Sequence, residues 1–87
     1  MKVILWRRAE KDLKRFPKID QLAISKKIRK IISEQEKVPT EKLKGFKNIG
    51  RIRVGCYRMI YIKAKEKIEI FLIAHRREVY NLLKKLL

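Results

Sequence analysis

The segment 51–61 reads Arg-Ile-Arg-Val-Gly-Cys-Tyr-Arg-Met-Ile-Tyr, the pattern of two short β-strands separated by a glycine. In its first half, the period of two of an extended chain sends Ile52 and Val54 to one side and Arg51 and Arg53 to the other. The glycine falls where we expect a bulge, a bend or a tight turn. This segment therefore predicts a sheet with one apolar face toward the core and one basic face.

Other segments supply the remaining strands of this sheet. The segments Cys56 to Lys63 and Ile68 to Ala74 are rich in Ile, Tyr and Phe, which is typical of strands. Lys63 to Lys67 is a polar connection of hairpin length. Lys2 to Trp6 reads as a further short strand. We therefore expect a mainly antiparallel sheet.

Three helices are also expected. The first covers residues 7–16 and ends at Pro17, because the residue before a proline avoids the helical region. The second has Asp20 as its N-cap and stops near Pro39. A short terminal helix covers 81–87. The last two carry apolar residues at helical spacing: Ile24, Ile28, Ile31, Ile32, Leu82, Leu83, Leu86 and Leu87.

The element order describes one α+β domain over residues 1–87, with an N-terminal strand and a helical hairpin packed on one sheet face. The opposite face, which would carry Arg51 and Arg53, is then left open. Cys56 is the only cysteine, so it has no disulfide partner, and we expect a small buried or half-buried side chain without chemistry. The sequence suggests neither a metal site nor a cofactor.

The charge of the chain points to a polyanionic partner. Lys and Arg number 25 against 9 Asp and Glu, which gives a formal net charge of +16. Nucleic acid is the leading partner, since each neutralised phosphate releases counterions; an acidic protein comes second and a membrane surface third. No run approaches the roughly 18 apolar residues of a spanning helix, and the opening segment 1–6 is too short for a signal peptide. We therefore expect a cytoplasmic protein.

Four motifs, in this order and spacing, give the chain a family likeness. The chain resembles the RelE/ParE superfamily of toxins from type II toxin-antitoxin systems. The segments that carry the resemblance are Leu13-Lys14-Arg15-Phe16-Pro17, Leu43-Lys44-Gly45, the segment 51–61, and His75-Arg76-Arg77-Glu78-Val79-Tyr80.

This resemblance implies a compact sheet with a helical hairpin, similar in architecture to microbial ribonucleases. RelE-like members cleave messenger RNA in the ribosomal decoding site, whereas ParE-like members inhibit DNA gyrase. Both are neutralised by an antitoxin encoded beside them. The partners implied are the ribosome, mRNA and an acidic antitoxin, with which the chain would form a hetero-oligomer.

RNA cleavage by its own 2′-hydroxyl needs a proton acceptor, cations for the charge that develops on phosphorus, and an acid for the leaving oxygen. By resemblance, Arg51 and Arg53 match the paired basic residues of the central strand in the RelE branch. Arg58 matches the arginine after the tyrosine in the same segment. Arg76 matches the arginine near the end of the last strand, and Tyr80 matches the tyrosine close to the C-terminus.

The proton acceptor is left open by the sequence. The best-known RelE protein has lysines on the central strand, whereas arginines stabilise charge but accept protons poorly. His75 and Tyr80 are the candidates; histidine ordinarily has a pKa near 6.5 and tyrosine near 10. Lys44, Lys47 and Arg77 are expected to contact RNA.

Structural roles compete with these assignments. His75 could only hydrogen-bond a backbone group at the end of a strand, and Arg51 and Arg53 could belong to a solvated sheet face. Arg58 could pair with a carboxylate such as Glu69 or Glu78. Tyr57 and Tyr61, at alternate strand positions, are more typical of core packing than of base stacking.

The sequence is compatible with three functions. The first is a metal-independent, ribosome-dependent mRNA endonuclease that inhibits translation. The second is a non-catalytic gyrase inhibitor, and the third is an RNA-binding relative that has lost catalysis. The basic set favours the endonuclease.

Overall fold

The computed structural model describes residues 1–35, 37, 38 and 42–87. Its element order agrees with the expected one: strand, two helices, three strands and a terminal helix. The elements are β1 (Lys2–Leu5), α1 (Arg7–Arg15), α2 (Lys18–Ile32), β2 (Ile49–Val54), β3 (Tyr57–Ala64), β4 (Lys67–His75) and α3 (Val79–Leu86).

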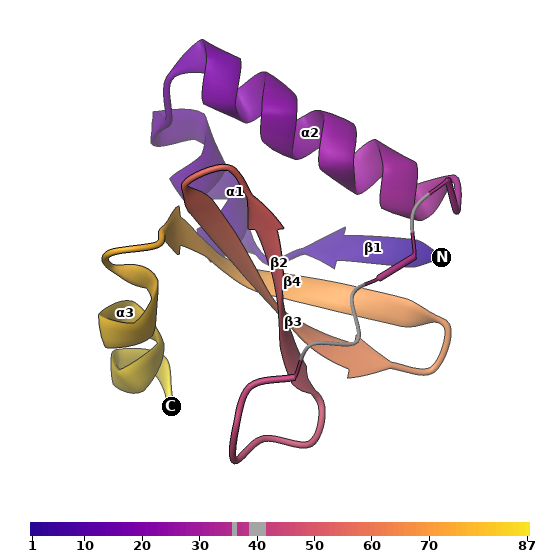
Figure 1. Cartoon of the computed structure of the whole chain (residues 1–87), viewed down its shortest axis with the longest axis vertical. Helices are drawn as coiled ribbons and strands as arrows, with labels where there is room; N and C mark the ends of the chain where they lie inside the picture. Colours follow the sequence, from indigo (N-terminus) through magenta and orange to yellow (C-terminus); the bar gives the residue numbers. More distant parts are fainter. Residues whose placement is uncertain (36, 39–41) are drawn as a thin grey trace.

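The four strands form one mixed sheet in the order β1-β4-β3-β2. The pairs β2/β3 and β3/β4 are antiparallel, and β1 pairs with β4 in parallel. The prediction of an α+β fold with a mainly antiparallel sheet is confirmed. Figure 1 shows the helical hairpin of α1 and α2 beside one face of the sheet, with α3 at the other side.

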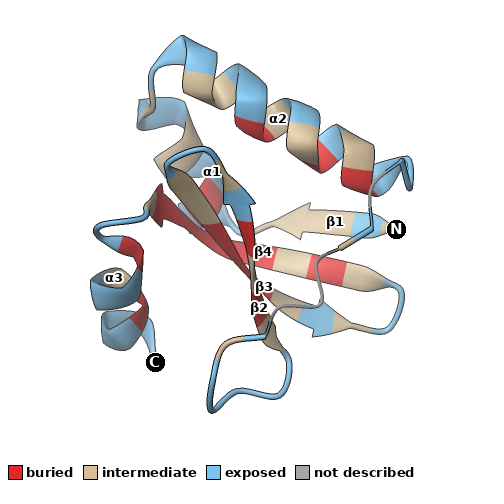
Figure 2. Cartoon of the chain, in the orientation of Figure 1, coloured by how far each residue is buried: buried red, intermediate tan, exposed pale blue. Residues whose placement is uncertain are grey.

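Helices pack on both faces of the sheet, so the core has two layers and the expectation that one face is left open is wrong. Toward the hairpin, Ile24 and Ile31 of α2 pack with Ile52 and Met59 of the sheet. Toward α3, a smaller layer packs around Val79 and Leu83, which are the buried residues of that helix. Figure 2 shows the buried residues gathered in the central strands and on the inner sides of the helices.

A bulge in β4 changes which residues face each side. Ile60 of β3 pairs with Leu72, but the next residue, Tyr61, pairs with Ile70, so Phe71 is an extra residue in β4. Before the bulge, even-numbered residues such as Ile70 face the hairpin. After it, Ile73 faces the hairpin instead. The bulge therefore reverses the alternation for the end of β4.

The second helix begins and ends earlier than the sequence suggested. It starts at Lys18 with Pro17 at the N-cap and without a side-chain cap, so the prediction of Asp20 as N-cap is wrong. Asp20 lies in the first turn, where a carboxylate complements the helix dipole. The helix ends at Ile32, followed by Glu34 with a φ of 62°. The expected stop at Pro39 lies outside the described residues.

Two further element boundaries and the burial of Cys56 differ from what the sequence predicted. The hairpin connection is shorter, because Lys63 belongs to β3 and Lys67 to β4. Cys56 lies exposed in the turn between β2 and β3, not buried as expected. The terminal helix begins at Val79, which brings Tyr80 into its first turn.

Candidate nucleic-acid interface

Three arginines share the face of the sheet that looks toward α3. Arg51 and Arg53 alternate with the buried Ile52 on β2, as the period of two predicts. Arg58 on β3 is the direct cross-strand partner of Arg53. Residues that oppose each other in an antiparallel pair project to the same side, so Arg53 and Arg58 place two cations close together.

Tyr80 reaches this cationic face from the first turn of α3. Its neighbour Val79 and the residue one turn on, Leu83, are buried against the sheet and hold the helix in place. The Tyr80 ring is 39% exposed. Its hydroxyl oxygen accepts a hydrogen bond from the guanidinium of Arg51. Arg51 and Tyr80 therefore form one unit, 29 residues apart in the chain.

Arg58 is anchored by backbone oxygens. Its guanidinium donates to the carbonyl of Gly55 at 3.0 Å and to the carbonyl of Tyr57 at 2.9 Å. Among the described residues, no ion pair joins Arg58 to Glu69 or Glu78. Glu69 instead accepts a hydrogen bond from the Trp6 indole at 3.1 Å. The charge of Arg58 is therefore oriented without being neutralised by these contacts.

The turn after β4 adds further cations at the same end of the sheet. The backbone N–H of Arg76 donates to the carbonyl of Cys56 at 2.7 Å, which holds this turn against the turn between β2 and β3. The side chains of Arg76 and Arg77 are exposed. Because Arg53 and Arg58 lie at the strand ends beside that turn, Arg76 belongs to the same region.

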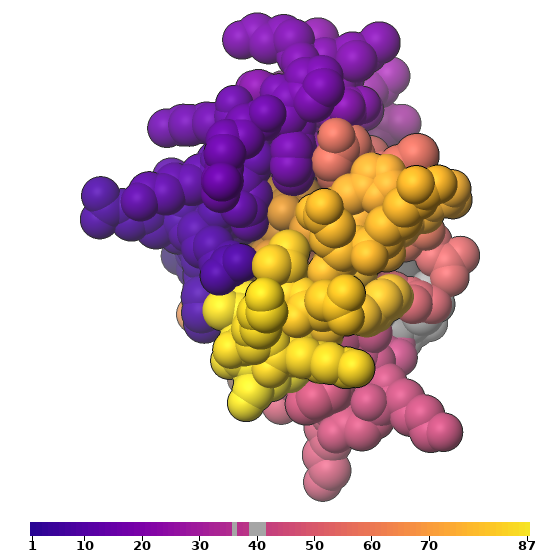
Figure 3. Space-filling view, turned by 90° about the vertical axis from the view of Figure 1, so that its left-hand side faces the viewer, coloured from indigo at the N-terminus to yellow at the C-terminus, as the bar shows by residue number. Residues whose placement is uncertain are grey.

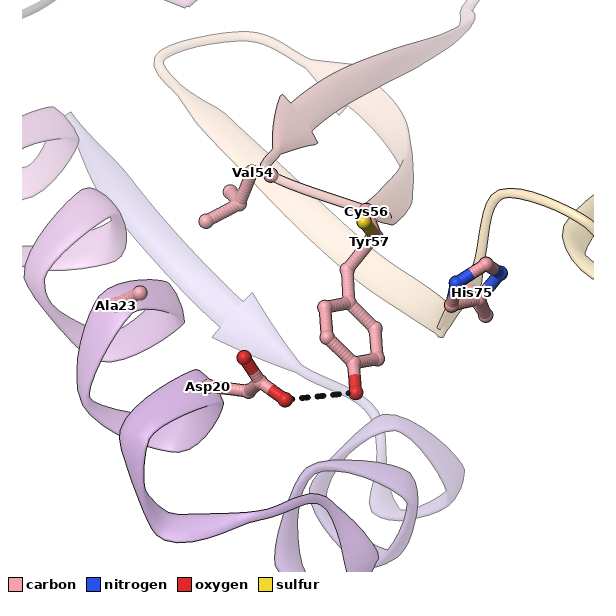
Figure 4. Close-up of a pocket in the computed structure, with 7 residues that line it drawn as sticks. Asp20, Ala23, Val54, Cys56, Tyr57 and His75 are labelled. Carbon is pink, nitrogen blue, oxygen red and sulfur yellow. Dashed lines mark hydrogen bonds between the residues drawn. The ribbon is translucent and has the colours of Figure 1, made fainter.

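His75 lies on the opposite face of the sheet. It is the cross-strand partner of Tyr57, and the two rings meet edge to face with centroids 5.9 Å apart. Its Nδ1 accepts the backbone N–H of Arg77 at 3.2 Å. Figure 4 shows His75 beside Tyr57 at a pocket that α2 closes on the other side, lined also by Asp20 and Ala23. The structure therefore separates His75 from Arg51, Arg53, Arg58 and Tyr80.

Tyr57 ties this second face together. Its hydroxyl donates to the carboxylate of Asp20 at 3.0 Å, and its ring packs on Phe16 at a centroid distance of 4.4 Å. The pKa of Tyr57 is raised above its ordinary 10.0. Burial of the phenol is the larger cause, and the hydrogen bond to the negatively charged Asp20 is the second. Tyr57 and the buried Tyr61 are thus core residues, as expected.

The loop before β2 carries the remaining residues expected to bind RNA. Lys44 and Lys47 are both exposed there. The loop is closed by a bridge between Lys42 and Gly50 and by the Leu43 N–H, which donates to the Ile49 carbonyl at 2.9 Å. Figure 3 shows α3 in yellow between this pink loop and the indigo N-terminal helices.

Comparison with known proteins places this arrangement in a family. Residues 3–80 match the model for the ParE toxin of the type II toxin-antitoxin system parDE. The chain belongs to the RelE/ParE toxin superfamily. No curated protein matches the chain.

Solved structures of RelE toxins share the fold. A chain of the RelB-RelE antitoxin-toxin complex from Methanococcus jannaschii is 26% identical, with a TM-score of 0.76 over 91% of this toxin and 96% of that chain. A chain of the archaeal RelE-RelB complex from Pyrococcus horikoshii OT3 is 28% identical, with a TM-score of 0.66 over 86% and 93%. The isolated E. coli RelE toxin is 22% identical, with a TM-score of 0.70 over 99% and 98%, and its likeness concerns the fold alone.

The described residues of the toxin contain neither a membrane-spanning helix nor a cluster of metal-ligating side chains. None of their helices is long and apolar enough to cross a membrane. They also contain no group of three or more His, Cys, Asp or Glu side chains placed to hold a metal ion.

Phe46, beside the cationic face of the toxin, is a candidate site residue that was not singled out from the sequence. Phe46, Lys84 and Leu87 line a groove with Arg51 and Tyr80. An aromatic residue directly after the glycine of a polar loop was the available signal for Phe46. Lys84 and Leu87 were read as part of the terminal helix, but their place beside the loop depends on the docking of α3, which a local pattern does not show.

Proposed function

We propose that this toxin is a ribosome-dependent mRNA endonuclease that stops translation. The observation that carries the proposal is the opposition of Arg53 and Arg58 beside the Arg51–Tyr80 pair. These arginines place several guanidinium groups on one face of the sheet. Their planar forks suit phosphate oxygens, so a phosphodiester bound at this face would be contacted by more than one cation.

The face supports cleavage by the 2′-hydroxyl of the RNA itself. The 2′-hydroxyl would give up its proton as its oxygen attacks the neighbouring phosphorus, while the bond to the 5′-oxygen breaks and that oxygen takes up a proton, so that a 2′,3′-cyclic phosphate and a free 5′-hydroxyl form. Arg51, Arg53 and Arg58 would stabilise the negative charge that develops on the phosphate oxygens, where preorganised donors have their largest effect. Tyr80 is the proton-transferring group we assign, because His75 lies on the other face of the sheet.

A gyrase inhibitor is the second candidate, and the match to the ParE toxin model favours it. In that case the same surface would bind a protein without chemistry. The two functions stop different processes first, so the order of events after induction distinguishes them.

Pulse labelling after induction of the toxin alone tests the proposal. We expect incorporation of labelled amino acids to fall before incorporation of labelled thymidine, because an endonuclease acts directly on translation. An earlier fall of DNA synthesis would support the gyrase inhibitor instead.

The same experiment with Arg53→Ala tests the site. Loss of one preorganised charge contact should raise the activation free energy by about 2.7 to 4 kcal/mol and slow mRNA cleavage by roughly a hundred- to a thousandfold. Arg29→Ala, an exposed arginine in the last turn of α2, is the matched control and should leave translation arrest intact. Equal arrest by both variants would place the site elsewhere.

A further inference from the structure

A groove runs between the loop before β2 and α3, and it opens beside the Arg51–Tyr80 pair. Its volume is about 530 Å³. Apolar side chains form most of its lining: Leu43, Phe46, Leu83 and Leu87. Within the described part of the chain, its charged lining residues are Lys44, Arg51 and Lys84, all of them cations.

The two sides of the groove are each fixed in place and each carry an aromatic ring. On the loop side, the Phe46 N–H donates to the Leu43 carbonyl at 3.1 Å, while the ring of Phe46 is 42% exposed. On the helix side, Tyr80 is fixed by the buried Leu83 and by the hydrogen bond from Arg51. The loop backbone at Phe46 and the Tyr80 side chain are therefore held in place before any ligand binds.

A nucleobase fits this combination of features. Aromatic side chains bind bases by stacking, and cations at the rim of a groove bind the phosphates on either side of a base. The groove also adjoins Arg51, which under the proposed function holds a phosphate of the RNA. The base of a nucleotide whose phosphate is bound at Arg51 would therefore reach the groove. Its cationic rim disfavours basic ligands.

We propose that this groove binds one nucleobase of the RNA substrate, next to the phosphate held by Arg51, with Phe46 as its stacking surface. The inference rests on the proposed function for its substrate. Phe46 is then a specificity-determining residue, because the base that stacks best in the groove selects the position of the nearby phosphate. Lys44 and Lys84 hold the flanking phosphates.

Fluorescence of 2-aminopurine tests this inference without cleavage. The probes are 2′-O-methyl hexaribonucleotides at low salt, uridine throughout except for one 2-aminopurine placed at each position in turn. The blocked 2′-oxygen prevents the reaction. With the wild-type toxin, one position should be quenched by stacking, and replacing that base with an abasic residue should weaken binding about 5- to 150-fold.

The variants separate stacking from general apolar packing. Phe46→Leu keeps an apolar side chain but removes the ring, so it should abolish the quenching and weaken binding to the same extent as the abasic probe. Leu22→Ala, at an exposed apolar position 61% accessible on α2, is the matched control and should bind like the wild type. Near-ultraviolet circular dichroism checks that both variants are folded.

Three results would overturn the inference. One is uniform fluorescence at every position with the wild-type toxin, and another is unchanged quenching with Phe46→Leu. The third is weaker binding of the cognate antitoxin to Phe46→Leu with unchanged RNA binding, which would assign the groove to the protein partner. Translation arrest by the wild type is measured separately, so a failure of the proposed function is distinguishable from a failure of the groove.

Discussion

At the scale of single residues, Arg53 and Arg58 show how backbone geometry and chemistry are linked. The alternation around Ile52 sends Arg53 to the α3 side, and the antiparallel register then fixes Arg58 opposite it. Bonds from Arg58 to two backbone carbonyls orient its guanidinium while leaving its charge available. A fixed, uncompensated charge is what a phosphate site requires, because no reorganisation is needed when the ligand arrives.

The Tyr57–Asp20 hydrogen bond gives a prediction for alkaline pH. Because the pKa of Tyr57 is raised in the folded state, the folded protein holds this proton more tightly than the unfolded chain does. Its contribution to stability is fully present below the ordinary tyrosine pKa of 10.0 and is lost as the pH rises through the folded value. Tyr57→Phe should therefore lose less stability than the wild type between neutral pH and pH values above about 10.

Urea unfolding at a series of pH values measures this difference. Removal of the hydroxyl should cost about 0.5 to 1.5 kcal/mol at neutral pH. Burial also raises the pKa of Tyr61, but Tyr61 is present in both proteins, so their difference isolates Tyr57. Asp20→Asn keeps an acceptor but removes the charge, and its alkaline sensitivity should be intermediate. Parallel curves for Tyr57→Phe and the wild type would contradict this account.

At the scale of elements, β2 was predictable and the end of β4 was not. The alternation of basic and apolar residues in β2 fixes its faces from sequence alone. In β4 the residues 68–74 are apolar almost throughout, because both faces of the strand are covered, so no alternation reveals the register. The bulge at Phe71 then reverses the faces and carries His75 to the hairpin side. Without that extra residue, His75 would face α3.

The ends of the helices show a similar limit. The stripe of isoleucines located α2, and Pro17 correctly marked the end of α1. Neither Ser33 nor Glu34 is a strong stop signal for a helix, yet the chain turns there through a positive φ at Glu34. Asp20 looked like a cap by residue type, but its tertiary partner Tyr57 explains its place in the first turn. Tertiary contacts of this kind are invisible to a local pattern.

The helix α3 connects packing to the site, because it carries Tyr80 and is held by few side chains. Leu83 is 6% exposed, whereas Leu86, one turn along, is 41% exposed. Leu83→Ala should cost about 2 to 5 kcal/mol of packing and release Tyr80 from Arg51. Leu86→Ala, the matched control, should change stability by no more than about 0.5 kcal/mol.

Hydrogen exchange and translation arrest together measure this coupling. We expect Leu83→Ala to lose protection in α3 and to lose translation arrest, while the amides of β3 stay protected because the hairpin layer of the core is intact. Full arrest by a variant whose α3 exchanges freely would show that Tyr80 does not need its helix.

At the scale of the whole molecule, the distribution of charge separates two sides. Ion pairs in the described part of the chain join Asp12 to Arg8 and Arg15 and the N-terminus to Glu34. All of these lie on or beside the hairpin of α1 and α2. The α3 side gathers Arg51, Arg53 and Arg58 with the exposed Lys44 and Lys84, and this concentration of positive charge acts on any approaching polyanion.

A net charge of +16 should also govern how the toxin meets its antitoxin. The related RelE structures from M. jannaschii and P. horikoshii are complexes with RelB, and we expect the antitoxin of this toxin to be acidic. Opposite fields accelerate encounter, and salt screens them over a Debye length of about 10 Å at 0.1 M. The association rate constant should therefore fall steeply as salt rises, while the dissociation rate constant changes little.

Stopped-flow mixing of the toxin with its cognate antitoxin would measure both rate constants. The charge reversal Lys26→Glu, on the exposed outer side of α2, lowers the net charge by two without touching the α3 side. If the net charge of the whole toxin steers association, this variant should associate more slowly than the wild type at low salt and equally fast at high salt. Its dissociation rate constant should be unchanged. If association were instead independent of salt, or if Lys26→Glu acted through dissociation, the charge would act through local contacts and long-range steering would be excluded.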